Sequence, residues 1–165
     1  MTISEDKYLN LIKWLDYHSH WPAENRISKQ YADHAVSEDR DVIVLNKGID
    51  PLLISHVQFA THLLREKGFI PDLIALHPYQ LSKIMQDVSM RYNNENPIMK
   101  RLLDCDILES DQIYAQRKKT MSVIWVLDTS PQNFVYGNGS IVVPRQLGCA
   151  VRIVCNNLPE TVSIF

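Results

Sequence analysis

The side chains in this sequence with the chemistry of a strong nucleophile are three cysteine thiols, and their surroundings argue against that use. Cys105 lies between Asp104 and Asp106, and neighbouring carboxylates raise the pKa of a thiol, which opposes formation of the reactive thiolate. Cys149 and Cys155 would lie on one face of a regular strand. The apolar residues that share this face are Val151 and Ile153. We therefore expect buried, unreactive thiols, and the odd number of cysteines does not suggest a disulfide framework.

Six histidines offer ligands for a metal ion, but their spacing does not favour one. His18 and His20 are two residues apart, and His56 and His62 are six residues apart on an expected helix. Two ligands on one helix face need a spacing of four, and no Glu lies where a zinc protease motif requires it. The glycines form neither a dinucleotide-binding nor a phosphate-binding fingerprint. We therefore expect no metal site, no cofactor and no catalytic residue.

The other candidate for a catalytic or ligand-binding residue is a carboxylate at the end of an expected strand. Asp128-Thr129-Ser130 follows the apolar run 123–127 and is similar to the Asp-Thr-Gly signature of aspartic proteases, in which two carboxylates share one proton. Ser130 replaces the glycine, Pro131 follows, and the run occurs once, so only a second copy of the chain could supply the second carboxylate. We favour a structural interpretation, in which the Asp128 side chain turns the chain. If the chain is an enzyme or binds a ligand, Asp128 is the first residue to test, because α/β folds often place ligands at strand ends.

Length and charge restrict the class of protein. A chain of 165 residues, 45% of them hydrophobic, can bury the core of one domain. The net charge of −2 argues against electrostatic binding to nucleic acid or to an anionic membrane, and we interpret the short basic run Arg117-Lys118-Lys119 as a solvated loop. No apolar run approaches the roughly 20 residues of a membrane helix, and the acidic N-terminal residues do not resemble a signal peptide. We expect a cytoplasmic protein with reduced thiols.

The elements that must position these residues are organised around the stretch 50–88. Asp50-Pro51 predicts a helix start, because Asp caps free backbone N–H groups and Pro suits the first helical position. Apolar residues then recur at helical spacing, and Gly68 predicts a left-handed stop. The apolar residues of this helix are Leu52, Leu53, Val57, Phe59, Ala60, Leu63 and Leu64. Their number predicts a heavily buried helix.

A short apolar run at 73–76, ended by His77-Pro78, predicts a strand buried on both faces. Pro78 can open a second helix. The apolar stripe of that helix consists of Leu81, Ile84, Met85 and Val88. The β-branched run 42–45 predicts a further strand, so residues 41–76 are typical of a strand–helix–strand unit. Its crossover should be right-handed if the two strands are parallel neighbours.

The remaining segments add an N-terminal helix and several strands. The helix is expected over 4–18, with one apolar face made by Tyr8, Leu11, Ile12 and Leu15. We expect a shorter helix or an arm at 24–35, loops at 37–41 and 91–97, and a short helix at 97–103. Strands are expected at 112–115, 121–127 and 149–155, and as a hairpin at 134–136 and 141–143. The predicted class is α/β to α+β, a single domain with a mixed β-sheet covered by two main helices and a strand-rich C-terminal half. Residues 1–40 would be a helical appendage to a core formed by residues 41–165.

A family resemblance is carried by the segment from Leu63 to Leu81, which reads LLREKGFIPDLIALHPYQL. It resembles part of the HK97-type major capsid proteins of tailed phages, which encapsulins share. In that family a helix ends at Gly plus an aromatic residue, followed by Pro-Asp, a short apolar strand, a Pro and another helix. This segment belongs to the A-domain, which surrounds the capsomer axis, and residues 121–127 and 149–155 match later strands. The chain has no room for the family's N-terminal arm, extended loop and peripheral domain, so the resemblance implies an A-domain-only, minimal encapsulin-like protein.

The resemblance implies a phage-related structural protein, not an enzyme, that self-associates into a ring or shell-like assembly, in the cytoplasm or in a virion or compartment shell. Its partners would be copies of itself, and a cargo or partner protein as well, with no membrane and no directly bound nucleic acid. We expect contact through the strand-rich second half and the hairpin around Asn138, because the two central helices must cover the sheet. The alternative is a small cytosolic enzyme or ligand-binding domain with an unidentified site near Asp128. A third interpretation is an adaptor that binds a partner through the N-terminal helix with Trp14 and Trp21.

Overall fold

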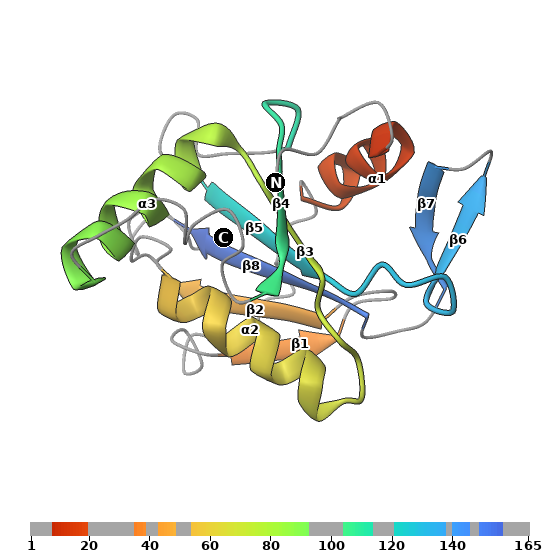
Figure 1. The fold of residues 1–165 in the computed structure, drawn as a ribbon, viewed down its shortest axis with the longest axis horizontal. Helices are drawn as coiled ribbons and strands as arrows, with labels where there is room; N and C mark the ends of the chain where they lie inside the picture. Colours follow the sequence, from red (N-terminus) through yellow and green to blue (C-terminus); the bar gives the residue numbers. More distant parts are fainter. Residues whose placement is uncertain are drawn as a thin grey trace, which may run out of the picture.

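The structure, a computed structural model, describes residues 8–19, 35–38, 43–48, 54–92, 104–113, 121–137, 140–145 and 149–156. These residues form the three helices and eight strands drawn in Figure 1. The helices are α1 (Leu9–Ser19), α2 (Ile54–Glu66) and α3 (Pro78–Tyr92). The strands are β1 (Ala35–Glu38), β2 (Ile43–Gly48), β3 (Leu73–Leu76), β4 (Asp106–Glu109), β5 (Met121–Leu127), β6 (Phe134–Gly137), β7 (Ser140–Pro144) and β8 (Ala150–Asn156). The predicted helix start at Asp50-Pro51 and the predicted helix at 97–103 lie outside the described residues.

Six of the strands form one mixed sheet in the order β1-β2-β8-β5-β3-β4. The pairs β2–β8 and β3–β4 are parallel, and the other three pairs are antiparallel. β2 and β3 therefore run in the same direction, but β8 and β5 lie between them. The crossover through α2 spans two strands, so β2 and β3 are not the parallel neighbours that the strand–helix–strand unit allowed. The mixed sheet and its helices confirm the mixed α/β class that the sequence predicts.

Helices cover both faces of the sheet. On one face, α2 and α3 pack against β3, β5 and β8, as the prediction of two covering helices requires. On the other face, α1 and the β6–β7 hairpin pack against the alternate residues of the same three strands. Trp14 of α1 lies against Trp125 of β5, with ring centroids 5.5 Å apart. The side chains of Trp125 and Arg152 are fully buried, and Arg152 is the register partner of Trp125 on β8.

Hydrogen bonds at its two ends determine where α2 begins and ends. At its start, the backbone N–H of Ile54 donates to the carboxylate of Asp87 on α3, at 3.1 Å, so one helix caps the other. At its end, Gly68 has a φ of +92°. The N–H groups of Gly68 and Phe69 donate to the carbonyls of Arg65 and Leu64, at 3.0 and 2.9 Å. This is the left-handed stop that the sequence predicts.

The start of α3 is set by His77 and Pro78. The Nδ1 atom of His77 accepts from the N–H of Tyr79 at 2.9 Å, and the His77 carbonyl accepts from the N–H groups of Gln80 and Leu81. The helix continues to Tyr92, so residues 91 and 92, predicted as loop, are helical. Before it, all four residues of β3 are buried, which confirms the predicted strand.

The N-terminal helix and the hairpin meet on the second face. The predicted apolar face of α1 is confirmed, since Tyr8, Leu11, Ile12 and Leu15 are buried against the sheet. α1 also packs beside β7 (Figure 1). β6 and β7 pair only with each other in the described part of the chain, as a separate two-stranded sheet. The division of the chain at residue 40 stays a prediction, while α1 and β1 are joined to the rest by packing and by strand pairing.

Two further local predictions, both about strands, were wrong. Residues 112 and 113, predicted as strand, lie in a turn in which the N–H of Ile113 donates to the Ser110 carbonyl. The strand of this region is instead β4, at residues 106–109, which pairs in parallel with β3. Residues 37 and 38, predicted as loop, belong to β1 and pair with β2. In both cases pairing with a neighbouring strand outweighs a polar local sequence.

Candidate functional site

Three aspartates lie at the end of the sheet where β3 and β4 begin and β5 ends. Backbone hydrogen bonds extend the pairing by one residue at this end. The N–H of Asp72 donates to the Leu127 carbonyl at 2.9 Å, and the N–H of Asp106 donates to the Asp72 carbonyl at 3.0 Å. The N–H of Asp128 donates to the Cys149 carbonyl at 2.9 Å. The strand pairing thus brings together three carboxylates from distant parts of the sequence.

Asp128, the residue singled out from the sequence, is 3% exposed and uses its carboxylate within the chain. One oxygen, Oδ1, accepts from the N–H and the hydroxyl of Ser130, at 3.0 and 2.7 Å. The other, Oδ2, accepts from the N–H of Ile70 at 2.8 Å. The bond to the residue two positions on is an Asx turn, which confirms that Asp128 turns the chain at the strand end.

Asp72 holds the next residue of the same turn, Thr129. Its Oδ1 lies 3.0 Å from both the backbone nitrogen and the hydroxyl of Thr129, and its Oδ2 lies 2.9 Å from that hydroxyl. Burial raises the pKa of Asp72, and the charges of Asp128 and Asp106 add to this, while the hydrogen bonds from Thr129 lower it. The net pKa of Asp72 is raised, so Asp72 holds a proton more tightly than an ordinary aspartate does.

Two tyrosines complete the cluster. The Tyr136 hydroxyl on β6 donates to the carbonyl of Thr129. Burial raises the pKa of Tyr136, and the charges of Asp72 and Asp128 raise it further. Tyr8, just before α1, also has a raised pKa, because of burial and then the charges of Asp72 and Asp106. The cluster therefore joins the sheet, α1 and the hairpin at one place.

Sequence reasoning found one member of this cluster. The carboxylate of Asp72 and the two tyrosine hydroxyls were not singled out, because no local spacing connects residues 8, 72 and 136. The one available signal is Pro71-Asp72 directly before a buried strand, which places a carboxylate at a strand end. The predicted basic run at 117–119 lies outside the described residues.

Cys105 and Cys149 are buried, as the sequence predicts, but Cys149 lies on a different face of the sheet from the predicted one. Cys105 is fully buried, and burial, followed by the charge of Asp72, raises its pKa to about 12. The neighbouring Asp104 and Asp106 contribute less than burial does. Cys149 is fully buried as well.

Cys149 lies on the face of the sheet opposite to the one predicted. It packs on the α1 side, whereas Val151 and Ile153 pack on the α2 side. The prediction was wrong because β8 begins only at Ala150, so the alternation of a regular strand does not extend back to residue 149. Its thiol donates to the Asn133 carbonyl at 3.6 Å. The side chain of Cys155 lies outside the described residues.

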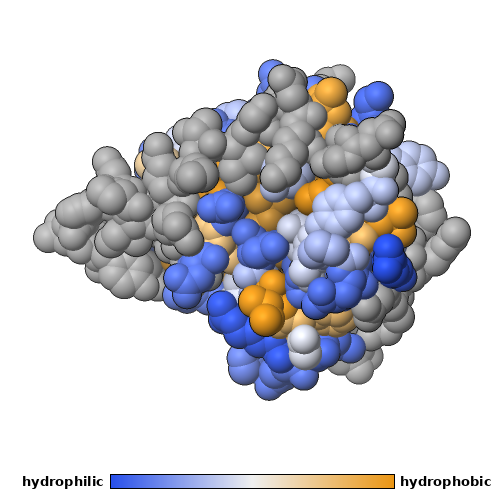
Figure 2. Space-filling view, turned by 45° about the vertical axis from the view of Figure 1, so that its right-hand side comes forward, coloured by the Kyte–Doolittle hydropathy of each residue, from blue (hydrophilic) through white to orange (hydrophobic). Residues whose placement is uncertain are grey.

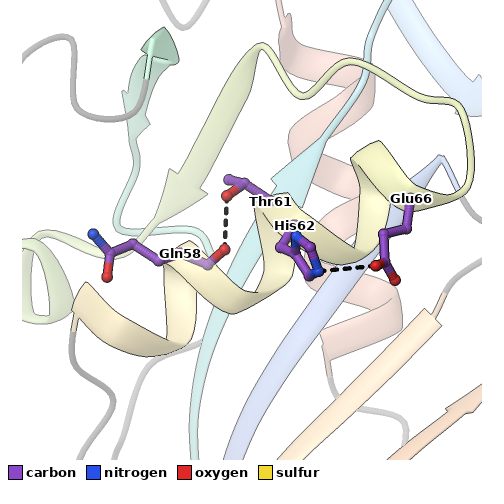
Figure 3. Close-up of polar contacts among 4 residues, drawn as sticks. All are labelled: Gln58, Thr61, His62 and Glu66. Carbon is purple, nitrogen blue, oxygen red and sulfur yellow. Dashed lines mark hydrogen bonds and ion pairs between the residues drawn. The ribbon is translucent and has the colours of Figure 1, made fainter.

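The histidines are not gathered at any one place in the described residues. His56 is 7% exposed on the inner side of α2. His62, on the outer side, forms an ion pair with Glu66 across 3.0 Å (Figure 3). His77 caps α3. Within the described ranges, no group of three or more His, Cys, Asp or Glu side chains has the arrangement of a metal site.

Comparison with known proteins adds no relative: no family model, no curated protein and no solved structure matches this chain. None of the helices in the described residues has the length and apolar character needed to cross a membrane. The function therefore has to be inferred from the surfaces and contacts of the chain itself.

Proposed function

We propose that the chain is a structural protein that self-associates, and that its copies meet through strand β6. The observation that carries this proposal is the exposure of two large side chains on that strand: Val135 is 41% exposed and Tyr136 is 38% exposed. Figure 1 shows β7 between α1 and β6, so β6 is the outer strand of the hairpin. In the described residues β6 pairs on one side only, and an open edge of this kind favours pairing with another chain.

Helix α2 is a poor candidate for the contact. The apolar residues of α2, including Val57, Ala60 and Leu64, are buried against the sheet. The opposite face of α2 is polar, with exposed Gln58, His62 and Glu66 (Figure 3). Figure 2, which turns the hairpin side of the molecule forward, shows hydrophobic surface in several places among hydrophilic residues. The exposed side chains of Val135 and Tyr136 give the hairpin an apolar contact surface, which the polar outer face of α2 lacks.

The resemblance of residues 63–81 to the A-domain of HK97-type capsid proteins and encapsulins supports the same class of function. Helix, glycine stop, buried strand, proline and second helix follow each other here in the order that the resemblance implies. A-domains surround the capsomer axis, and a repeated head-to-tail contact closes a ring when its rotation permits. We propose a ring or shell-like assembly of an A-domain-only protein, with a cargo or partner protein as a further component.

Light scattering on a size-exclusion column at micromolar concentration tests this proposal. We expect a mass several times the 19.1 kDa of one chain. Val135→Lys places a charge on the open strand edge and should lower the mass to that of one chain. The matched control is Ile70→Lys, because Ile70 is 74% exposed and lies between α2 and β3, outside the hairpin. This variant should keep the wild-type mass.

Two outcomes would overturn the proposal in different ways. A wild-type mass near 19.1 kDa, unchanged on concentration, would remove self-association altogether and turn attention to an enzyme or ligand-binding domain near Asp128. If the Val135→Lys variant still assembles, the chain self-associates, but strand β6 is not the contact between copies. The hydrogen bonds of Asp128 favour the structural function over that alternative, because one carboxylate oxygen already accepts from Ser130 and the other from the N–H of Ile70.

A further inference from the structure

Strand β4 is the last strand of the six-stranded sheet, and in the described residues it pairs on one side only, with β3. The N–H groups of Asp106 and Ser110 donate to carbonyls on the β3 side, at 3.0 and 3.2 Å. Backbone groups alternate in direction along a strand, so residues 106, 108 and 110 turn theirs toward β3. The N–H and C=O groups of Ile107 and Glu109 therefore point toward the open edge.

The open edge of β4 is acidic. Carboxylates occupy four of the eight positions from 104 to 111, and this stretch contains no lysine or arginine. Their residues are Asp104, Asp106, Glu109 and Asp111, of which Asp106 is half-buried and the other three are exposed. Within the described part of the chain, none of these four carboxylate groups accepts a hydrogen bond or forms an ion pair. Burial raises the pKa of Cys105, just before β4, and the charge of Arg65 opposes this, so one end of the edge has a cation nearby.

The edges of β4 and β6 differ in charge. β6 has no charged residue, whereas two of the four residues of β4 are carboxylates. Like charges that lie opposite each other destabilise a strand pair, and opposite charges stabilise it. β4 is therefore a poor partner for β4 of another copy, and its charge is complementary to a strand that carries lysine or arginine.

We propose that the β4 edge binds an extended, basic segment of a partner protein as an added strand. The side chains of β4 set the pattern of that segment. Leu108 packs on the α1 side of the sheet and Ile107 on the α2 side, and alternation places Asp106 with Leu108 and Glu109 with Ile107. The order along β4 is acidic, apolar, apolar, acidic, so the added strand should be basic, apolar, apolar, basic. This site is separate from the β6 contact and does not depend on self-association.

Fluorescence anisotropy of labelled peptides mixed with the full chain tests the proposal. The probe is a peptide of about eight residues, an ordinary strand length, with the repeat Lys-Lys-Val-Val. This repeat contains the basic, apolar, apolar, basic order. We expect saturable binding of one peptide per chain, and the affinity should fall when NaCl is raised from about 50 to about 500 mM, because salt screens exposed charges.

Two control peptides separate strand pairing and residue order from charge. A Lys-Lys-Pro-Pro repeat keeps the charge, but proline has no N–H and interrupts strand pairing, so its binding should be at background. A peptide of alternating lysine and valine keeps both the charge and the composition and changes the order. It should bind about threefold to tenfold more weakly than the probe, since each of its faces mismatches β4.

Three variants of the chain locate the site. Glu109→Lys reverses an exposed charge on β4 and should weaken binding of the probe by about threefold to tenfold. Glu66→Lys is the matched control, because it makes the same charge change on the outer face of α2 (Figure 3), and it should keep the wild-type affinity. Ile107→Pro removes an N–H that points toward the open edge, a position where a strand tolerates proline. It should abolish binding while circular dichroism shows the wild-type fold, and if it does not fold, the Lys-Lys-Pro-Pro peptide decides the same point.

The proposal is overturned if the Lys-Lys-Pro-Pro peptide or the alternating peptide binds as tightly as the probe, or if Glu109→Lys and Glu66→Lys bind the probe equally. A lack of saturable binding up to about 1 mM peptide would also overturn it, and the charges of β4 would then only protect an open edge. Light scattering on the same samples tests assembly separately. A single-chain mass with specific peptide binding would support the β4 site and remove the proposed function, and an assembled protein that does not bind would do the reverse.

Discussion

Asp72 and Thr129 are 57 positions apart in the sequence, and the carboxylate of one accepts from the backbone N–H of the other at 3.0 Å. Asp72 stands just before β3, and Thr129 stands two residues after the end of β5. The contact exists because β3 and β5 are antiparallel, with Leu73 opposite Leu127. The pairing of β3 with β5 therefore forms one part of the sheet and also brings Asp72 and Thr129 together at its end.

The first prediction concerns stability against pH. The pKa of Asp72 is raised above its ordinary value of 3.8 in the folded protein, mainly by burial, so the folded state binds this proton more tightly than the unfolded state does. The stability that this proton contributes is fully present below the ordinary pKa, and it is lost as the pH rises through the raised pKa. We expect the wild type to gain free energy of unfolding relative to Asp72→Asn between about pH 7 and about pH 4. Urea unfolding of both proteins at several pH values measures this, and a constant difference would contradict it.

The second prediction concerns the core under α2. Leu64 is fully buried in the cluster between α2 and the sheet. Leu64→Ala should lower the free energy of unfolding by roughly 2–5 kcal/mol, the usual effect of removing a buried leucine side chain. The control is Gln58→Ala on the exposed face of the same helix, which should change stability by less than about 0.5 kcal/mol. Equal denaturation midpoints for the two variants would show that the buried face of α2 is misplaced.

The third prediction concerns the stop of α2. Gly68 has a φ of +92°, and no atom beyond its own residue and its two chain neighbours lies within 4 Å of the position that a Cβ would occupy there. Gly68→Ala should therefore lower stability through backbone strain alone, by about 1–2 kcal/mol. Gly68→Asn is the informative comparison, because Asn tolerates the left-handed region better and should lower stability less. Thermal unfolding of the three proteins measures the order, and an alanine variant as stable as the wild type would contradict it.

The fourth prediction concerns the reactivity of Cys105. A pKa of about 12 leaves the thiol almost entirely protonated at neutral pH, and the thiolate is the reactive form. We expect iodoacetamide to label Cys105 slowly in the folded protein and quickly in urea, as peptide mapping by mass spectrometry would show. Rapid labelling of the folded protein at neutral pH would contradict both the burial and the raised pKa.

The elements that the sequence predicts well are those with strong local signals. The strand at 73–76 is four apolar residues between a glycine stop and a proline, and α2 has a clear apolar face. β4 lacks such a signal, because only Ile107 and Leu108 of its four residues are apolar. It is a strand because β3 lies beside it, and the position of β3 is set by contacts far away in the sequence.

The candidate site, like β4, depends on contacts between residues that are distant in the sequence, so the sequence predicts it only in part. Asp128 could be singled out because it follows a long apolar strand directly. The proximity of Asp72, Asp106 and Tyr136 to it depends on strand order and direction, and neither is encoded in local spacing. The face occupied by Cys149 was mispredicted for a related reason, since it depends on the residue at which β8 begins.

The place of β8 in the sheet has a consequence for synthesis of the protein on the ribosome. β8 is made after every other described strand, yet it lies between β2 and β5. Until it emerges, β1–β2 and β5–β3–β4 cannot join, and the open edges of β2 and β5 are templates for wrong pairing. About a hundred residues separate β2 from β8, which corresponds to about 5–20 s of synthesis. A nascent chain of this protein therefore spends that interval with an incomplete sheet, when it is most in need of a chaperone.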